Sequence, residues 1–186
     1  MNEKDKMMSG QLYDANYNLE LEKERMRAKD KCFEFNNIKP SNIEERNEII
    51  KELLGSTKKN FRIEQPFMCD YGYNIEIGEN FYSNHNLVIL DANKVTFGNN
   101  VFIAPNCGFY TAGHPLEVEA RNKGLEYAKP IKVGNNVWIG GNVVVLPGVT
   151  IGDNSVIGAG SIVNKDIPAN AVAVGNPCRV IKFLDK

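Results

Sequence analysis

Residues 133–168 read VGNNVW, IGGNVV, VLPGVT, IGDNSV, IGAGSI and VNKDIP, six hexads that follow one another without a gap. Each hexad begins with an aliphatic residue, and a small residue usually follows it. Six units in one register indicate a repeat architecture. A period of six residues suits neither an α-helix nor a simple hairpin ladder. It suits a solenoid in which each hexad supplies a short strand and a corner, and three hexads complete one triangular coil.

The first position of each hexad identifies the expected core of this solenoid. These positions are occupied by Val133, Ile139, Val145, Ile151, Ile157 and Val163. We expect their side chains to stack inward, coil upon coil, as one continuous core. Glycine and asparagine recur at the corners, where they accept positive φ angles that bulkier residues resist. The sequence therefore predicts a mainly β protein built around a parallel β-helix.

The same frame continues upstream with interruptions. IGENFY begins at residue 77 and SNHNLV at residue 83; after a segment two residues too long, FGNNVF, IAPNCG and FYTAGH cover 97–114. A second break over 115–131 separates this half from the regular one. It holds the polar segment PLEVEARNKGLEYAKP, which is bounded by prolines and predicts a protruding loop.

The first 60 residues contain no hexad and predict a helical cap region. Residues 41–44, SNIE, are typical of a capping box with Ser41 at the N-cap. Ile43 and Arg46 would share the buried face of the following helix, which Gly55 would end. We expect two short helices to cover the open first coil.

Three regions follow from this reading. The helical cap spans 1–60, the β-helix with its loop spans 61–178, and a short basic, amphipathic tail spans 179–186 at the other end.

Composition excludes several classes of function. The 186 residues carry a net charge of −1, which gives no electrostatic case for binding nucleic acid or an anionic membrane surface. No segment approaches the roughly 18 to 20 apolar residues that span a bilayer. The N-terminus, MNEKDKMMSG, is too charged for a signal peptide, so we expect the protein in the cytoplasm. The four cysteines are widely spaced, which predicts buried hydrophobic side chains.

His114 is the candidate reaction centre. It takes the last place of a hexad, where the chain leaves the solenoid for the loop. A β-helix has no activity of its own, so function is sought where the repeat breaks. An imidazole, with an ordinary pKa of about 6.5, can accept a proton from a hydroxyl and pass it to a leaving thiolate. A solvated corner histidine is the alternative at this point.

Several segments together carry a specific resemblance. They are GQLY at 10–13, CDYG at 69–72, FYSNHN at 81–86, VILDA at 88–92, TAGHP at 111–115, VWIG at 137–140, AGS at 159–161 and GNPCR at 175–179. The chain thus resembles the maltose and galactoside O-acetyltransferases over nearly its whole length. The resemblance implies a left-handed β-helix and direct transfer of acetyl from acetyl-CoA to a sugar hydroxyl.

The same resemblance implies the site residues. His114 would be the general base, and Asn84 would contact the acceptor or the oxyanion. Asp70, Tyr82 and Asp91 would line the acceptor pocket. From its place late in the protruding loop, and not from the resemblance, Glu126 is also expected to face the acceptor. Coenzyme-binding positions, in a groove between subunits of a homotrimer, would be Trp138, Gly141, Ala159, Asn164, Lys165, Arg179 and Lys182. No metal is implied.

Some positions depart from the family pattern. Galactoside enzymes carry a second aspartate where this chain has Ala92, and the positions of Asn164 and Lys182 often carry Thr and Arg. Asp14, Asn16 and Tyr17 compete for the place of an N-terminal acceptor aspartate. These differences favour a maltose or glucose acceptor.

Three alternatives remain open at this point. A drug-modifying acetyltransferase of the same superfamily would differ only in its acceptor. A zinc carbonic anhydrase on this scaffold needs three histidine ligands, whereas the chain has His85 and His114 alone. A trimeric scaffold without activity would make the break at His114 incidental.

Overall fold

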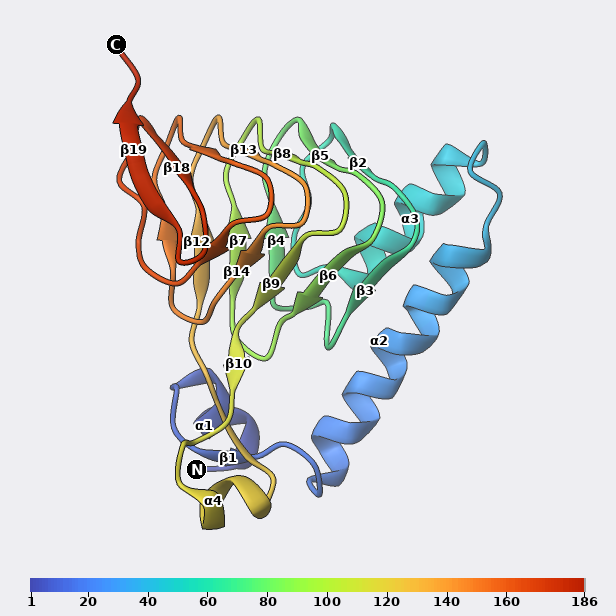
Figure 1. Ribbon diagram of the computed structural model, residues 1–186. Coiled ribbons are helices and arrows are strands. Elements are labelled where there is room, and N and C mark those ends of the chain that lie inside the picture. The colour runs from blue at the N-terminus through green and yellow to red at the C-terminus, as the bar shows by residue number, and fades with distance from the viewer. Residues whose placement is uncertain (186) are drawn as a thin grey trace.

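The computed structural model describes residues 1–185 and has a solenoid of stacked coils with two helices at one end and two beside it (Figure 1). The helices are α1 (Glu3–Met8), α2 (Leu19–Asn37), α3 (Ile43–Leu53) and α4 (Val118–Asn122). Among these residues no helix has both the length and the apolar character needed to cross a membrane.

Three parallel sheets form the faces of the solenoid. The four-stranded sheet contains β4 (Ile75–Ile77), β7 (Val95–Phe97), β12 (Ile131–Val133) and β15 (Thr150–Ile151). The five-stranded sheet contains β3 (Phe67–Cys69), β6 (Leu87–Leu90), β9 (Gly108–Tyr110), β14 (Val144–Val145) and β17 (Ile162–Val163). The seven-stranded sheet contains β2 (Phe61–Ile63), β5 (Phe81–Ser83), β8 (Phe102–Ile103), β13 (Trp138–Ile139), β16 (Val156–Ile157), β18 (Ala171–Val174) and β19 (Arg179–Phe183). The last pair, β18 and β19, is antiparallel.

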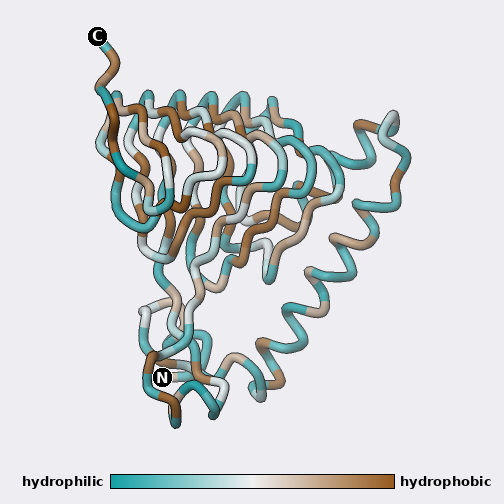
Figure 2. The backbone as a smooth tube through the Cα atoms, in the orientation of Figure 1, coloured by the Kyte–Doolittle hydropathy of each residue, from teal (hydrophilic) through white to brown (hydrophobic). Residues whose placement is uncertain are grey.

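The predicted core is confirmed. The six first-position side chains are at most 4% exposed, and the fifth-position side chains of the same hexads are also buried. Two of the latter are serines, and each donates a hydrogen bond to a backbone carbonyl: Ser155 to Pro168 at 2.9 Å and Ser161 to Gly158 at 2.6 Å. In Figure 2 the hydrophobic strands alternate with hydrophilic turns around the coils.

Asparagines hold the corners, as expected. Asn136 and seven other asparagines have φ angles between 55° and 61°. Along one corner the side-chain amides form a ladder, in which each Nδ2 donates to the Oδ1 of the asparagine one coil further on. The ladder runs through Asn80, Asn100, Asn136, Asn154 and Asn170. The corner residues thus satisfy their polar groups with their own counterparts.

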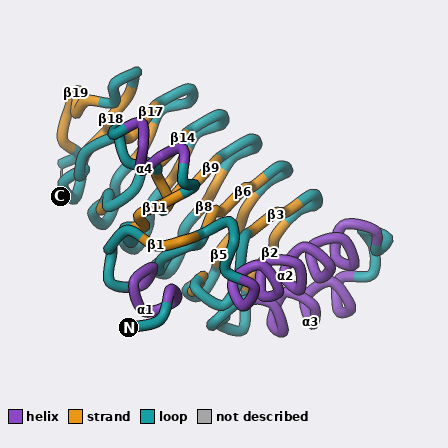
Figure 3. The backbone as a smooth tube through the Cα atoms, turned by 90° about the horizontal axis from the view of Figure 1, so that it is seen from below, coloured by secondary structure: helices purple, strands orange, loops and turns teal. Residues whose placement is uncertain are grey.

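Helices α2 and α3 cover the first coil (Figure 3). Cys32 and Phe35 from α2 and Ile50 from α3 join the same apolar core as the solenoid strands. The cysteine prediction is confirmed, because all four are buried and free. Arg46 is buried as well and pairs with Glu64 at 3.0 Å.

Local details of the cap differ from the prediction. Ser41 lies in a turn that is closed by a hydrogen bond from the Asn42 N–H to the Lys39 carbonyl. Helix α3 therefore begins one residue later than predicted, and its N-cap residue, Asn42, makes no side-chain cap hydrogen bond. Ile43 is 42% exposed. Gly55 follows the helix because a Cβ there would lie 2.2 Å from the Tyr73 carbonyl oxygen. Helix α2 is also long, with 19 residues.

The protruding segment is not an irregular loop. It contains α4 and β11 (Leu125–Ala128), and β11 pairs with β10 (Ala112–Gly113) on one side and with β1 (Tyr13–Asp14) on the other. This small antiparallel sheet lies outside the solenoid, beside α1 and the start of α2 (Figure 1). Strands of two to four residues leave too little periodicity to be recognised in a sequence.

Candidate active site

The small sheet positions His114 and fixes its tautomer. His114 follows β10 directly, and its Nδ1 lies 3.0 Å from the Leu125 carbonyl oxygen on β11. A carbonyl oxygen only accepts, so Nδ1 carries the hydrogen and the neutral ring keeps its lone pair on Nε2. That nitrogen lies 3.7 Å from Oε1 of Glu126. The ring is therefore oriented to accept a proton at Nε2.

Glu126 connects His114 to the N-terminal segment. Tyr13 is opposite Glu126 in the β1–β11 pairing, and the Tyr13 hydroxyl donates to Glu126 Oε2 at 2.9 Å. Burial and the neighbouring Glu126 carboxylate raise the pKa of Tyr13 well above its ordinary value. Tyr13 thus remains a hydrogen-bond donor that fixes the orientation of the carboxylate.

A cavity of about 260 Å³ adjoins this group. Its polar wall includes Asp70, Glu126 and Asn16, and Ala92 contributes a methyl group. Burial raises the pKa of Asp70. We call this space the acceptor cavity. Its carboxylates and amides suit the hydroxyl groups of a small polar molecule.

Arg25 is a component of the acceptor cavity that the sequence did not reveal. Its guanidinium donates to the Tyr71 hydroxyl at 2.8 Å and to the Ala15 carbonyl at 2.6 Å. Burial raises the pKa of Tyr71 to about 12. In the sequence, Arg25 is one of many charged residues in α2. Its partner Tyr71 lies far along the chain, and its other partner, Ala15, belongs to no motif. For Tyr13 a signal existed, the GQLY segment.

Asp91, predicted to bind the acceptor, is not among the residues that line the cavity in the single chain. It has no exposed surface, and its Oδ1 accepts the backbone N–H groups of Asp70 at 3.0 Å and Tyr71 at 2.9 Å. Burial raises its pKa to about 6. Asp91 therefore orients the backbone that carries Asp70.

The structure also separates the three N-terminal candidates for an acceptor contact. Asp14 is used locally, because its Oδ1 accepts the N–H groups of Asn16 and Tyr17. Tyr17 is 76% exposed. Of the three, Asn16 alone lines the acceptor cavity, where its Nδ2 donates to the Gly124 carbonyl at 3.1 Å.

Asn84 and Tyr82 lie away from the acceptor cavity within one chain. Asn84 follows β5 at the corner that precedes the five-stranded sheet, whereas His114 lies beyond the opposite end of that sheet's β9. The Oδ1 of Asn84 accepts the His85 N–H at 2.8 Å, and among residues 1–185 its Nδ2 has no partner. This leaves the amide as a donor for a group outside the chain.

Tyr82 belongs to an outward row on the seven-stranded sheet, which starts at its register partner Arg62 on β2. The row continues through the register partners Phe102, Trp138, Val156, Val172 and Lys182. Trp138 is 57% exposed, so it does not pack in its own core. The row thus connects a predicted acceptor contact to two predicted coenzyme contacts.

The remaining coenzyme candidates form two groups on the later coils, the first of them at the corner that Asn84 and His85 occupy in an earlier coil. Gly141 and Ala159 belong to one corner, where the Gly160 N–H donates to the Gly141 carbonyl. A Cβ at residue 141 would lie 3.3 Å from the Pro105 carbonyl oxygen. Asn164, Lys165 and Arg179 form a second, exposed group, in which an Arg179 nitrogen lies 3.4 Å from Asn164 Oδ1. Small residues and exposed cations of this kind fit a thin pantetheine arm and phosphates.

These features define a class, the hexapeptide-repeat acetyltransferases, and comparison with known proteins defines the family. The family described as maltose acetyltransferase hexapeptide capping motif matches residues 6–58, and bacterial transferase hexapeptide (six repeats) matches 130–165. The galactoside O-acetyltransferase of Escherichia coli K12 is 54% identical over 89% of this chain and 81% of its own.

Two solved structures agree with this assignment. A maltose O-acetyltransferase from Clostridium difficile 630 has a TM-score of 0.97 at 53% identity, covering 100% of this chain and 99% of that one. A galactoside acetyltransferase in complex with coenzyme A has a TM-score of 0.96 at 49% identity, covering 100% and 92%. The chain belongs to the maltose and galactoside O-acetyltransferase family and is an acetyl-CoA-dependent acetyltransferase.

Proposed function

We propose that this acetyltransferase transfers acetyl to a hydroxyl of a maltose-type or glucose-type sugar, with His114 as the general base. The observation that carries the proposal is the bond from His114 Nδ1 to the Leu125 carbonyl, which directs the basic Nε2 toward Glu126 at the edge of the acceptor cavity. The family membership supports a sugar acceptor. The methyl of Ala92 in the cavity wall supports glucose or maltose, because the galactoside enzymes carry an aspartate there.

The reaction is a direct transfer. Nε2 of His114 takes the proton from the acceptor hydroxyl as that oxygen attacks the thioester carbonyl carbon, and a carbon–oxygen bond replaces the carbon–sulfur bond. The proton then moves from Nε2 to the departing thiolate, which returns the imidazole to its starting state. Glu126 stabilises the imidazolium while the ring holds the proton.

Asn84 is proposed to stabilise the developing negative charge. Its Oδ1 is held by the His85 N–H, so its Nδ2 can donate to the carbonyl oxygen without itself titrating. Asn84 and His114 lie beyond opposite strand ends of the five-stranded sheet, Asn84 before β6 and His114 after β9 and β10. Asn84 of one subunit and His114 of its neighbour therefore come together most simply when these two sides of adjacent subunits face each other.

We propose a homotrimer with one site at each interface. The outward row on the seven-stranded sheet supports it, because Phe102 is 49% and Trp138 57% exposed in the single chain. Outward apolar side chains in a continuous row are typical of a surface that another subunit covers. Sedimentation should give three chains per particle, and a stable monomer with full activity would contradict the proposal.

Subunit mixing tests the shared site directly. The variants His114→Ala and Asn84→Ala should each be nearly inactive alone. When they are unfolded together and refolded, about a quarter of the sites should combine intact His114 and Asn84 from different chains, and activity should return to that fraction. No recovery would show that both residues of a site come from one chain.

The acceptor is tested by kcat/KM with acetyl-CoA held fixed. Maltose and glucose should exceed a β-galactoside and chloramphenicol. A preference for chloramphenicol would indicate the drug-modifying alternative instead.

A further inference from the structure

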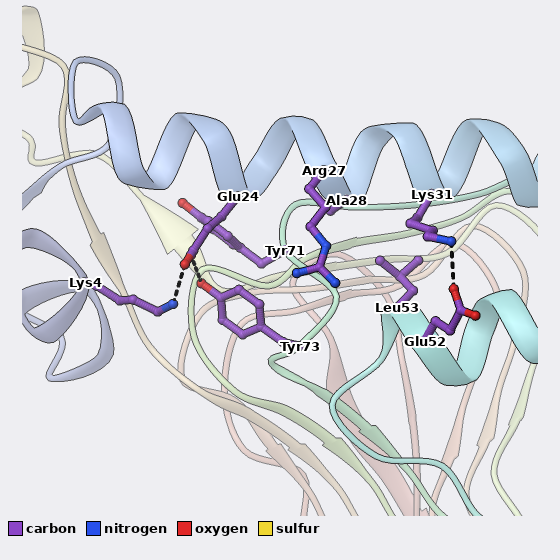
Figure 4. Close-up of a pocket in the computed structure, with 9 residues that line it drawn as sticks. All are labelled: Lys4, Glu24, Arg27, Ala28, Lys31, Glu52, Leu53, Tyr71 and Tyr73. Carbon is purple, nitrogen blue, oxygen red and sulfur yellow. Dashed lines mark hydrogen bonds and ion pairs between the residues drawn. The ribbon is translucent and has the colours of Figure 1, made fainter.

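A second cavity, of about 160 Å³, lies between the N-terminal helices and the segment that follows β3 (Figure 4). We call it the helix-cap cavity. Helices α1, α2 and α3 each contribute to its wall, and the segment after β3 contributes Tyr71 and Tyr73. Tyr71 also lines the acceptor cavity, so the two cavities lie on either side of this residue. None of the groups proposed for acetyl transfer lines the helix-cap cavity.

Ion pairs close the two ends of this cavity. At one end Lys4 Nζ lies 2.7 Å from Glu24 Oε1, and Glu24 Oε2 accepts the Tyr73 hydroxyl at 2.6 Å. At the other end Lys31 Nζ lies 2.7 Å from Glu52 Oε2. Figure 4 shows the two pairs at opposite sides of the space. The charges at both ends are therefore already matched.

Arg27 is an exposed arginine whose charge lowers the pKa values of Glu24 and Glu52 without a direct contact to either carboxylate. Its guanidinium points into the space between the two ion pairs in Figure 4, and within residues 1–185 it forms no hydrogen bond or ion pair. Lys31 also pairs with Glu34 at 3.1 Å, so Arg27 is the one cation of this wall that has no bonded carboxylate among the described residues. A guanidinium with five donors in a fixed fork is best satisfied by a planar anion.

The rest of the wall is apolar. The rings of Tyr71 and Tyr73 stand 5.5 Å apart at an angle of 47°, Lys4 Nζ lies 4.4 Å from the centre of the Tyr73 ring, and Ala28 and Leu53 complete the wall. Such a surface favours a flat or aliphatic group over a hydroxylated one.

We propose that the helix-cap cavity binds a small monocarboxylate with an apolar body, whose carboxylate pairs with Arg27. A single guanidinium matches one carboxylate in a bidentate pair. A phosphate dianion is disfavoured, because it would bring two negative charges close to Glu24 and Glu52, whereas a carboxylate brings one. The body of the ligand would lie against Leu53 and the tyrosine rings.

Calorimetric titration with benzoate, in the absence of acetyl-CoA and acceptor, tests this site independently of acetyl transfer. Benzoate should bind once per chain, and neutral benzamide should bind at least tenfold more weakly. Arg27→Gln should weaken benzoate binding at least tenfold, the size of effect expected for a charged hydrogen-bonded pair. Arg27→Lys should weaken it less, because the charge remains while the fork is lost.

The matched control is Lys29→Gln. It removes one positive charge from the same helix, but Lys29 lines the acceptor cavity and not the helix-cap cavity. Benzoate affinity should stay within about twofold of the parent protein. The proposal is overturned if benzoate does not bind, if phosphate binds more tightly, if Arg27→Gln binds equally well, or if Lys29→Gln and not Arg27→Gln abolishes binding.

Discussion

The regular coils of residues 133–168 and the small sheet of β1, β11 and β10 use polar side chains in different ways. In the coils the asparagines of one corner meet their own counterparts one coil away, as Asn136 meets Asn154. In the small sheet Tyr13, Glu126 and His114 come from separate parts of the chain, and Glu126 and His114 are 3.7 Å apart. Repetition satisfies hydrogen bonds automatically, whereas a break in the repeat leaves groups that are incompletely paired. Such groups are available for chemistry.

The largest effect should come from the small sheet. His114→Ala should lower kcat by about 10³-fold, the scale of a lost general base, while the thermal unfolding midpoint and coenzyme A binding persist. His85→Ala removes the other histidine, a corner residue whose Nδ1 contacts the Gln65 carbonyl, and should change kcat less than about threefold. Steady-state kinetics on both variants compares them. Equal losses would remove the distinction between the two histidines.

The coils should show the opposite pattern, a loss of stability with little loss of chemistry. Ile139 has no exposed surface, so Ile139→Ala should lower the free energy of unfolding by about 3 kcal/mol through lost burial and a residual cavity. Thr150→Ala, on an outward position, should cost less than about 0.5 kcal/mol. Urea unfolding at one protein concentration measures both. Similar costs at the two positions would contradict the inward and outward assignment.

A pair of corner asparagines sharpens the comparison further. Asn84→Ala should lower kcat by about 10²-fold with little change in KM, as expected for a lost oxyanion donor. Asn86 has a φ of 61° and donates to Asn106 at 2.9 Å, so Asn86→Ala should affect stability and leave kcat nearly unchanged. Kinetics and unfolding on both variants separate the roles. A silent Asn84→Ala would mean that this amide is another corner residue.

The fold could be predicted from the sequence because its signal is periodic. The hexads determine which residues face inward, and that assignment is confirmed from Val133 to Val163. The helical cap was predictable in kind but not in detail. A turn before α3 displaced the N-cap from Ser41 to Asn42, and no hexad or motif announces such a turn.

The candidate site was predictable only in part. A motif pointed to Asp70 and the place late in the loop to Glu126, and both residues line one cavity. Arg25 was missed because its partner Tyr71 lies 46 residues away, and a helix charge with a tertiary partner has the same local pattern as a solvated one. Asp91 was predicted to contact the acceptor because it lies in a family motif, and a motif does not show whether a side chain is buried.

The smallest expected effect is the contribution of Asp91 to the pH dependence of stability, and its direction is well defined. Its pKa of about 6 exceeds the ordinary aspartate value of 3.8, so the folded state holds a proton more tightly than the unfolded state. The folded state therefore gains stability as pH falls from about 7 toward 5 and loses it as pH rises through 6. From these two pKa values the gain between pH 7 and pH 5 is about 1 kcal/mol.

Asp91→Asn isolates this contribution, because the amide oxygen can still accept the two backbone N–H groups and the side chain no longer titrates. The stability difference between the parent protein and the variant should shift by about 1 kcal/mol in favour of the parent from pH 7 to pH 5. The test is this pH-dependent change in the stability difference. The cost of placing an amide where Asp91 Oδ2 has no partner is the same at both pH values, so it cancels. In the coils, Thr150→Ala should show no such shift, because it removes no ionisable group. If the stability difference between the parent protein and Asp91→Asn is the same at pH 7 and pH 5, the pKa of Asp91 is ordinary. Burial of this carboxylate near the site would then carry no electrostatic cost.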